Sequence, residues 1–217
     1  MIVFKNFSVW YKIGLTSKKI VLKEAEFSIQ KNTITGIIGL NGEGKTSMIK
    51  AILGLNQNKN YELYIDSSIE ENKSINNLLR ISYVPEIPSN ELNFTVKEYL
   101  QLNAMINSSR NDTDLENLTD KFKLNEYLSQ RFSVISKGTK KRVLIVAALQ
   151  ADWELIVLDE PFEGLDIIQR DILKEFLIKE SRGRYILISS HEVLELKQFC
   201  SSIIKVDQRK VYEFFHV

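Results

Sequence analysis

Cysteine is almost missing from this sequence, since Cys200 is the only one among 217 residues. A single thiol can form neither an internal disulfide nor a zinc cluster, so disulfide-rich domains and zinc-cluster proteins are excluded. Scarce cysteine is also typical of proteins in reducing compartments. With 44% hydrophobic residues, the chain is long enough to form one domain around its own core.

An excess of basic charge is missing as well. Lysine and arginine total 29 against 28 for aspartate and glutamate, which gives a net charge of +1. Proteins that bind DNA or RNA usually carry a basic excess or a basic stripe that neutralises phosphates. Basic pairs such as Lys18-Lys19 are short, and we expect them on a solvated face. The composition therefore predicts no nucleic-acid partner.

Long hydrophobic runs are also absent. A helix needs about 20 apolar residues to span a bilayer, whereas the longest apolar runs, such as Leu155 to Leu158, are the size of a strand. The first residues, Met1 to Phe7, lack the basic start and the apolar stretch of a signal peptide. We expect a soluble, cytoplasmic chain.

The first third of the sequence contains strand-like segments and one helix-like segment. Residues 2–4, 7–11 and 20–29 are interrupted by polar residues, as in antiparallel strands with one wet face. A short β-branched run at 33–39 ends in glycine, and a helical pattern around residues 48–53 follows it. A strand, a glycine turn and a helix in this order open a βαβ unit.

The last third alternates between strand and helix. We expect strands at 155–158 and 185–189, an amphipathic helix at 167–180 and a helix at 192–199. Such alternation indicates a mostly parallel sheet with helices on both faces. A closing hairpin is expected from 203–206 and 211–214.

The middle of the sequence is mainly helical. Thr95-Val-Lys-Glu98 has the pattern of a capping box before a helix that ends near residue 106, and the pattern is helical again from 115 to 151. We therefore predict an α/β fold in one domain. Residues 1–87 and 151–217 would form the core with an antiparallel β part, and residues 88–150 an inserted α-helical subdomain.

Gly39-Leu-Asn-Gly-Glu-Gly-Lys-Thr46 matches the P-loop pattern G-x-x-x-x-G-K-[ST] between a strand and a helix. Glycines let backbone N–H groups turn toward phosphate oxygens, and the helix start adds partial positive charge. Lys45 would reach the β- and γ-phosphates, and the Thr46 hydroxyl would coordinate Mg²⁺. The nucleotide-binding residues expected here are Gly39, Leu40, Asn41, Gly42, Glu43, Gly44, Lys45, Thr46 and Ser47.

Leu155 to Leu158 is an apolar strand that ends in two carboxylates, Asp159 and Glu160. Strands that end in this way are common. After a P-loop, however, the first carboxylate is expected to hold Mg²⁺, often through water. The second could orient or deprotonate the attacking water.

At this point the chain resembles the ATPase subunits of the ATP-binding-cassette (ABC) transporter family over nearly its whole length. The family's signature is Leu-Ser-Gly-Gly-Gln followed by basic residues, and Ile135-Ser-Lys-Gly-Thr-Lys-Lys-Arg142 lies in its place. Ser136 and Gly138 match, whereas Lys137 and Thr139 depart from the pattern. An ordinary serine N-cap is the alternative interpretation of Ser136.

Other family positions follow in order. Tyr83-Val-Pro-Glu86 lies at the Q-loop with Glu86 in place of glutamine, Pro161 to Asp166 resembles the D-loop, and Ser189-Ser-His191 resembles the switch region. Val9-Trp-Tyr11 matches the aromatic residue that stacks on adenine. From its place in the family's pattern we favour Tyr11, and only one of the two can stack, because neighbouring residues on a strand face opposite sides. The alternative is that both aromatics only pack.

The resemblance implies a head-to-tail dimer, homomeric or heteromeric, with two ATP molecules at its interface. Glu160 would polarise water, while Lys45 and His191 stabilise the transferring phosphoryl group. Thr46, Asp159 and Glu86 would hold Mg²⁺, and Ser136, Gly138 and Asp166 would lie near the partner's nucleotide. A transmembrane permease subunit would dock on a groove between the Q-loop and the helical subdomain. Candidates for lining it are Ile87, Leu92, Phe94, Tyr99 and Leu100, and the alternative for these residues is packing.

Several neighbouring classes fit less well. Ribosome-acting cassette proteins carry two cassettes, and chromosome-maintenance cassettes need a coiled coil between Lys45 and Ser136 for which the sequence leaves no room. A small P-loop kinase would have no use for the signature or for His191. A soluble iron–sulfur assembly ATPase remains the alternative. The Ser-Lys-Gly-Thr variant, Glu86 and the short C-terminus resemble bacterial exporters of peptides, antibiotics or polysaccharides, bound through a permease to the inner face of the cell membrane.

Overall fold

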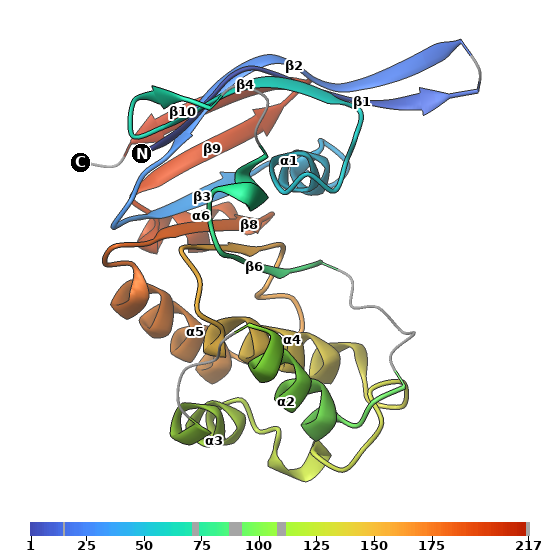
Figure 1. Cartoon of the computed structure of the whole chain (residues 1–217), viewed down its shortest axis with the longest axis vertical. Helices are drawn as coiled ribbons and strands as arrows, with labels where there is room; N and C mark the ends of the chain where they lie inside the picture. Colours follow the sequence, from blue (N-terminus) through green and yellow to red (C-terminus); the bar gives the residue numbers. More distant parts are fainter. Residues whose placement is uncertain (15, 71–73, 87–92, 108–111, 216–217) are drawn as a thin grey trace.

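The computed structural model describes residues 1–14, 16–70, 74–86, 93–107 and 112–215 (Figure 1). Two β-sheets lie at one end of the molecule, and a group of helices lies at the other. Within the described residues no helix is both long enough and apolar enough to cross a membrane.

The first sheet is antiparallel, with strand order β2-β1-β4-β5. Its inner face is aromatic: Phe4 stacks on Phe27, with ring centroids 4.9 Å apart, and Phe7 stacks on Tyr61 at 5.5 Å. The two segments expected at 2–4 and 7–11 are one strand, because register shifts absorb the polar residues between Phe4 and Trp10 without ending the pairing. The strands are β1 (Ile2–Ile13), β2 (Ser17–Ile29), β4 (Lys59–Ile65) and β5 (Ser68–Ile69).

The second sheet has the order β10-β9-β3-β8-β7-β6 and is parallel except for β10, which pairs antiparallel with β9. Every residue of β3, β7 and β8 is buried, as a parallel sheet covered on both faces requires. The expected α/β fold, with its P-loop and its antiparallel part, is confirmed. The strands are β3 (Ile34–Ile38), β6 (Ile81–Val84), β7 (Leu155–Leu158), β8 (Tyr185–Ser190), β9 (Ser202–Asp207) and β10 (Lys210–Phe215).

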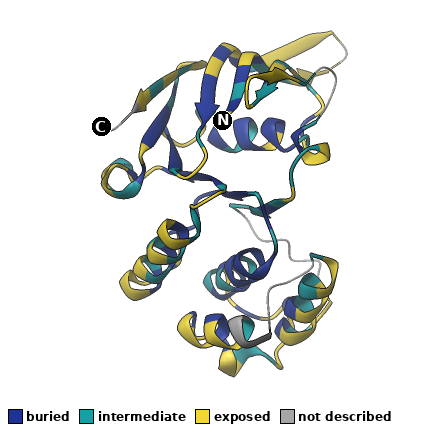
Figure 2. Cartoon of the chain, turned by 60° about the vertical axis from the view of Figure 1, so that its left-hand side comes forward, coloured by how far each residue is buried: buried dark blue, intermediate teal, exposed yellow. Residues whose placement is uncertain are grey.

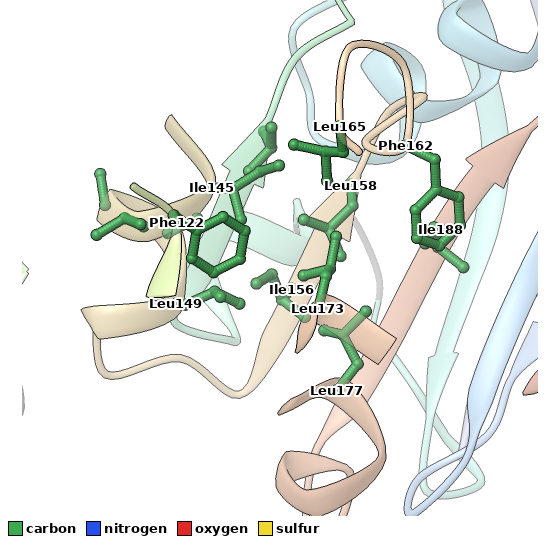
Figure 3. Packing of buried hydrophobic residues seen from close by; sticks show 14 of the residues in the cluster. Phe122, Ile145, Leu149, Ile156, Leu158, Phe162, Leu165, Leu173, Leu177 and Ile188 are labelled. Carbon is green, nitrogen blue, oxygen red and sulfur yellow. The ribbon is translucent and has the colours of Figure 1, made fainter. Parts of the chain in front are cut away.

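Two hydrophobic cores lie on opposite faces of this second sheet. Along β7, Leu155 and Val157 enter the core shared with the antiparallel sheet, whereas Ile156 and Leu158 enter the core shared with the helices, because successive strand residues face opposite sides. Figure 3 shows Ile156 and Leu158 among the apolar side chains of the second of these cores, and Figure 2 shows mainly buried residues in the strands of the second sheet and mixed buried and exposed residues on the helices. Both faces of β7 are therefore packed, which fixes the position of the residues that follow it.

In the described part of the chain, helices pack together in the segment between β6 and β7, and further helices follow β3, β7 and β8 (Figure 1). The capping box at Thr95 is confirmed, since its side chain accepts from the Glu98 N–H and the Glu98 carboxylate accepts from the Thr95 N–H. The helices are α1 (Lys45–Ile52), α2 (Val96–Ile106), α3 (Asp112–Lys121), α4 (Lys137–Gln150), α5 (Ile167–Glu180) and α6 (Val193–Phe199), with 3₁₀ turns η1 (Ile75–Asn77) and η2 (Asn125–Tyr127).

The continuous helical stretch expected from 115 to 151 was wrong. Helix α3 ends at Lys121, and residues 122–136 form turns before α4. Phe132 is fully buried in this segment, and the Arg142 side chain donates to the carbonyl of Phe122 at 2.7 Å. The burial of Phe132 and the hydrogen bond from Arg142 stabilise this path of the chain in place of a continuous helix. Strands β4, β5 and β6 were not predicted, because their short runs are mixed in polarity.

Candidate nucleotide-binding and catalytic site

The P-loop turns directly from β3 into α1. Gly44 is the residue before the helix, with φ of 110° and no side-chain cap, so the first backbone N–H groups of α1 are left for another acceptor. A Cβ on Gly39 would lie 2.6 Å from the carbonyl oxygen of Val206. This distance is too short, so only glycine fits at this position. Near the turn, the Leu40 N–H donates to the Glu43 carboxylate at 3.2 Å.

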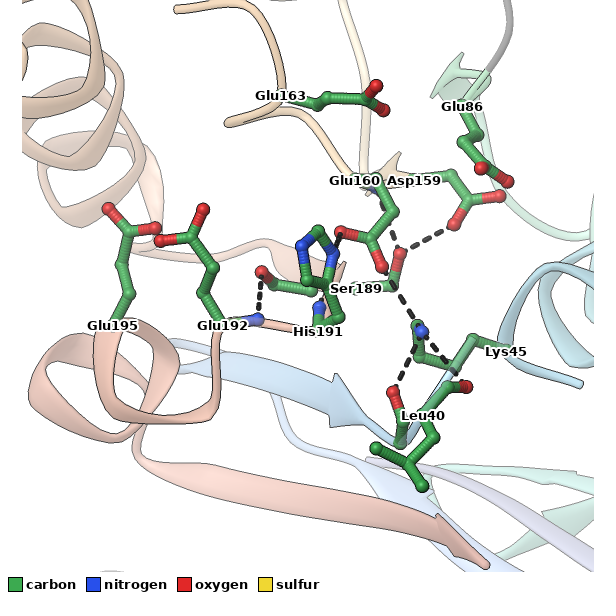
Figure 4. A network of polar contacts seen from close by, with 12 residues as sticks. Leu40, Lys45, Glu86, Asp159, Glu160, Glu163, Ser189, His191, Glu192 and Glu195 are labelled. Atoms are coloured by element: carbon green, nitrogen blue, oxygen red, sulfur yellow. Dashed lines mark hydrogen bonds and ion pairs between the residues drawn. The ribbon is translucent and has the colours of Figure 1, made fainter. Parts of the chain in front are cut away.

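Lys45 links this turn to the end of β7. Its Nζ donates to the carbonyls of Gly39 at 2.9 Å and Leu40 at 3.5 Å, and lies 3.2 Å from Glu160 Oε1. Both Lys45 and Glu160 are almost fully buried. The sequence separates these two residues by more than a hundred positions, and the parallel sheet brings them together because β3 and β7 end at the same edge (Figure 4).

Glu160 is held by a second group as well. Its Oε2 accepts from the His191 backbone N–H at 3.2 Å and lies 2.9 Å from His191 Nδ1. Glu160 itself has φ of 47°, a left-handed conformation that costs free energy for a non-glycine residue and is common at functional sites. Lys45, Glu160 and His191, all expected from the sequence, therefore form one cluster.

Thr46, Glu86 and Asp159 meet beside this cluster. The Thr46 hydroxyl donates to Glu86 Oε2 at 3.2 Å. Asp159 is completely buried, and burial raises the pKa of its carboxyl against the lowering effect of the nearby Ser189 and Thr46 hydroxyls. Its Oδ2 has no hydrogen-bond partner in the described part of the chain. An unpartnered, buried carboxylate oxygen of this kind is suited to a cation.

This donor set fits Mg²⁺, which prefers hard oxygen ligands. Among the described residues no group of three or more histidine, cysteine, aspartate or glutamate side chains could hold a metal by itself. An ion beside Asp159 would need phosphate or water oxygens in addition to the protein, as Mg²⁺ usually does. The Thr46 hydroxyl and the Glu86 carboxylate are the further protein ligands available.

Two residues in the site were given no role by the sequence. Ser189, fully buried, donates to Asp159 Oδ1 at 2.5 Å and accepts from the Glu160 N–H at 3.0 Å. Lys141 donates to the carbonyls of Asp159, Pro85 and Glu86 at 2.7, 2.8 and 3.2 Å. Burial lowers the pKa of Lys141 to about 8, against the raising effect of nearby carboxylates. Only its position after the signature could have drawn attention to Lys141.

Ser136, Gly138 and Asp166 do not join the P-loop in this chain. Ser136 is the exposed N-cap of α4 and accepts from the Thr139 N–H at 3.1 Å, as the alternative interpretation stated. A Cβ on Gly138 would lie 3.2 Å from the Gly164 carbonyl, so signature and D-loop touch each other. Asp166 caps α5 and pairs with Lys123 at 3.2 Å. No hydrogen bond or ion pair described here joins these three residues to 39–47.

Tyr11 and Trp10 face opposite sides of β1. The Tyr11 hydroxyl donates to Ser47 at 3.1 Å, which places its ring beside the start of α1. The Trp10 ring lies under the ammonium group of Lys18, 4.9 Å from its centroid. This arrangement supports Tyr11 as the residue available for stacking on a base.

We expect Tyr11→Ala to weaken ATP binding by about 1 kcal/mol, the contribution of an aromatic stacking contact. Trp10→Ala is the matched control, because it removes an aromatic ring from the other side of the same strand. Titration of both variants with ATP measures the difference. A loss of affinity confined to folded Trp10→Ala would show that the two roles are reversed.

A sequence model of the ABC transporter family matches residues 22–163, well over half of the chain. The chain belongs to the ABC transporter family. It is an ATP-binding subunit of such a transporter, an ATPase that energises transport. The cluster of Lys45, Glu160 and His191 thus lies in an ABC cassette.

Similar cassettes include both exporters and importers. The chain is 31% identical to the ABC-type transporter ATP-binding protein EcsA of Bacillus subtilis, over 85% of this chain and 76% of that protein. It is 32% identical to the cytochrome c biogenesis ATP-binding export protein CcmA of Reclinomonas americana, over 89% and 88%. It is 28% identical to the zinc import ATP-binding protein ZnuC of Rickettsia bellii, over 86% and 76%.

Solved structures agree with this assignment. A structure of an ATP-binding subunit of an ABC transporter has a TM-score of 0.82 and 28% identity, over 99% of this chain and 89% of that one. A dimeric bacterial ABC transporter cassette has a TM-score of 0.81 and 23% identity, over 99% of this chain and 98% of that one, which shows that the fold is shared.

The structure places some of the residues predicted for the permease groove in the core instead. Leu100 is buried in the helical core, and Tyr99 packs partly against it with its ring 5.2 Å from that of Phe132, so the structure assigns both to packing. Phe94 is 41% exposed and stays a candidate. Ile87 and Leu92 lie outside the described residues.

Proposed function

We propose that this cassette pairs head to tail with a second cassette, identical or different, and holds two Mg·ATP molecules between them. The observation that carries this proposal is the division of the expected site residues. Lys45, Glu160 and His191 are gathered at one edge of the sheet, whereas in the described part of the chain no hydrogen bond or ion pair joins Ser136 or Gly138 to that cluster. Residues of the signature would then contact the nucleotide bound by the partner.

Each residue has a distinct part in hydrolysis. Mg²⁺, held by Thr46, Asp159 and Glu86, would neutralise phosphate charge. Lys45 stabilises the γ-phosphoryl group as charge moves onto the leaving oxygen. Glu160 accepts a proton from the attacking water.

His191 has two tasks in this scheme. Its side chain is 47% exposed and lies against Glu160, so it can orient the carboxylate and also touch a γ-phosphate. Glu160 Oε1 forms an ion pair with Lys45, and Oε2 contacts His191. When Lys45 turns to the phosphates, Glu160 Oε1 is released to accept from water.

We further propose that the cassette powers export of a peptide, antibiotic or similar compound. The basis is the signature variant Ser136-Lys-Gly-Thr139 together with Glu86, which resembles exporter cassettes. Because both CcmA and ZnuC are similar to this chain, overall similarity does not decide direction. Membership in the ABC transporter family favours a transport function over the alternative of an iron–sulfur assembly ATPase.

The permease would dock on the helical end of the cassette, at the inner face of the membrane. We propose that residues 88–150 form the helical subdomain and that 1–87 and 151–217 form the core. Exposed apolar side chains lie on α2, with Met105 82% and Leu102 40% exposed. Phe94, just before this helix, is exposed as well. A membrane subunit is the partner that such a surface suits.

The direction of transport can be tested in the organism that carries the gene. We expect deletion to increase sensitivity to one or more compounds in a panel of antimicrobial peptides and drugs, because the compound would then accumulate inside. The wild-type gene should restore resistance, and a Glu160→Gln gene should not. If deletion instead creates a nutritional requirement that added metal or another solute relieves, the cassette serves an importer and the export proposal is wrong.

A further inference from the structure

Lys141 is a buried cation to which the hydrolysis scheme assigns no part. Its residue is 3% exposed, and its ammonium group donates to the carbonyls of Asp159, Pro85 and Glu86 at 2.7, 2.8 and 3.2 Å. Burying an ammonium group costs free energy unless its donors are satisfied. Three carbonyls match its three protons, so the side chain is held in one position.

The three carbonyls belong to the ends of two neighbouring strands. Asp159 follows β7 and Glu86 follows β6 by two residues, and both carry side chains assigned above to Mg²⁺. Lys141 itself comes from α4, the helix that begins after Ser136. One ammonium group therefore joins the signature helix to the residues that hold the metal of this chain's own ATP.

The first turn of α4 is also held firmly by hydrogen bonds and burial. Ser136 and Thr139 are joined through both backbone and hydroxyl groups, at 3.1 and 2.8 Å. The side chains of Thr139 and Lys141 are buried. A displacement of Ser136 would accordingly move Lys141 with it rather than be absorbed in a loose turn.

We propose that Lys141 is a positioning residue that couples the two ATP sites of the cassette pair. When Ser136 contacts the nucleotide of the partner, this contact sets the position of α4. Lys141 moves with the helix and, through its hydrogen bonds, sets the positions of Asp159 and Glu86. The inference rests on the proposed function, because it needs Ser136 at the partner's nucleotide. A misplacement of about 1 Å in such a site lowers the rate by roughly 10²-fold, so small shifts of α4 are enough.

The test measures ATP hydrolysis in the complete transporter complex with its permease. Lys141→Met removes the three donors at similar volume, and we expect kcat to fall by about 10- to 100-fold while KM for ATP changes by less than about threefold. Lys141→Arg should retain most of the rate, because a guanidinium can still donate to several carbonyls.

Lys140→Met is the matched control. Lys140 is the neighbouring buried lysine of α4, but its ammonium approaches the Ser133 carbonyl at 3.5 Å and the Phe132 ring at 6.0 Å instead of the metal ligands. We expect this variant to keep kcat within about twofold of wild type.

A double-mutant cycle tests the coupling itself. Ser136→Ala and Lys141→Met should lower kcat together by clearly less than the product of their separate effects, because both interrupt one connection. Ser136→Ala with Lys140→Met should be multiplicative. Multiplicative effects for Ser136 with Lys141, or a kcat for Lys141→Met within about twofold of wild type, would overturn the proposal.

Folding and the proposed function are controlled separately. Thermal melting checks each variant, and if Lys141→Met does not fold, the cycle is run with Lys141→Gln, which keeps one amide donor group. The activity of Glu160→Gln tests the proposed function separately. If Glu160→Gln is inactive while Lys141→Met is fully active, only the coupling role of Lys141 is refuted.

Discussion

Glu160→Gln is expected to lower the rate of ATP hydrolysis by about 10²–10⁴-fold, the usual contribution of general-base assistance. The amide keeps the size of the carboxylate but cannot accept a proton from water. Nucleotide binding should persist, because the P-loop is unchanged. The measurement is steady-state phosphate release with the membrane partner present.

A matched control separates charge from catalysis. Glu175→Gln makes the same substitution on an exposed face of α5 and should leave the rate unchanged. A Glu160→Gln protein that hydrolyses ATP at the wild-type rate would show that another group activates water.

The same variant should reveal the cassette pair. With hydrolysis blocked, ATP remains at the interface, and a homodimeric cassette should double in mass on a sizing column when ATP is added. Adding Ser136→Arg should prevent this, because a bulky cation would replace the exposed hydroxyl at the partner's nucleotide. If the natural pair is a heterodimer, the second cassette is added before the measurement. Full ATP-dependent pairing of the Ser136→Arg double variant would contradict the head-to-tail arrangement.

Lys45→Ala is expected to remove most ATP binding, and hydrolysis with it. A charged hydrogen bond contributes about 1.5–3 kcal/mol, which corresponds to a roughly 10- to 150-fold weaker Kd for one such contact. Lys45 would make several contacts to two phosphates, so the loss should reach or exceed the upper part of this range. Equilibrium binding of ATP measures it.

Lys50→Ala serves as the control for Lys45→Ala, since Lys50 is exposed in the last turn of the same helix. Within the described residues, removing Lys45 also leaves buried Glu160 with His191 as its remaining side-chain partner. Thermal melting therefore accompanies the binding measurement. Unchanged ATPase activity in Lys45→Ala would refute the assignment of the P-loop as the nucleotide site.

Local patterns in the sequence were sufficient to predict many of the elements around the site. The P-loop between β3 and α1, the apolar run of β7 and the capping box at Thr95 depend on neighbouring residues alone. Helix α5 has the bounds expected from its amphipathic period. In each of these, local propensity and tertiary packing favour the same structure, which is why they could be predicted.

Other features depended on contacts that local patterns do not encode. Residues 122–136 have a helix-like composition but form turns, because burial of Phe132 and the bond from Arg142 to the Phe122 carbonyl favour that path. Leu100 was expected to line a groove and lies in the core. An apolar residue on a helix can serve either purpose, and only the packing of α2 on α4 decides.

The sequence by itself determined the family, the P-loop and the carboxylates at the end of β7, because their residue types and spacing are set by phosphate and metal chemistry. The tertiary structure decided how these groups meet. Parallel strands bring Lys45 to Glu160, and the end of β8 supplies Ser189 to Asp159. Helix α4 carries Lys141 to three carbonyls far away in sequence. A backbone carbonyl is the same in every residue, so no pattern of side chains can indicate which ones a buried ammonium group will bind.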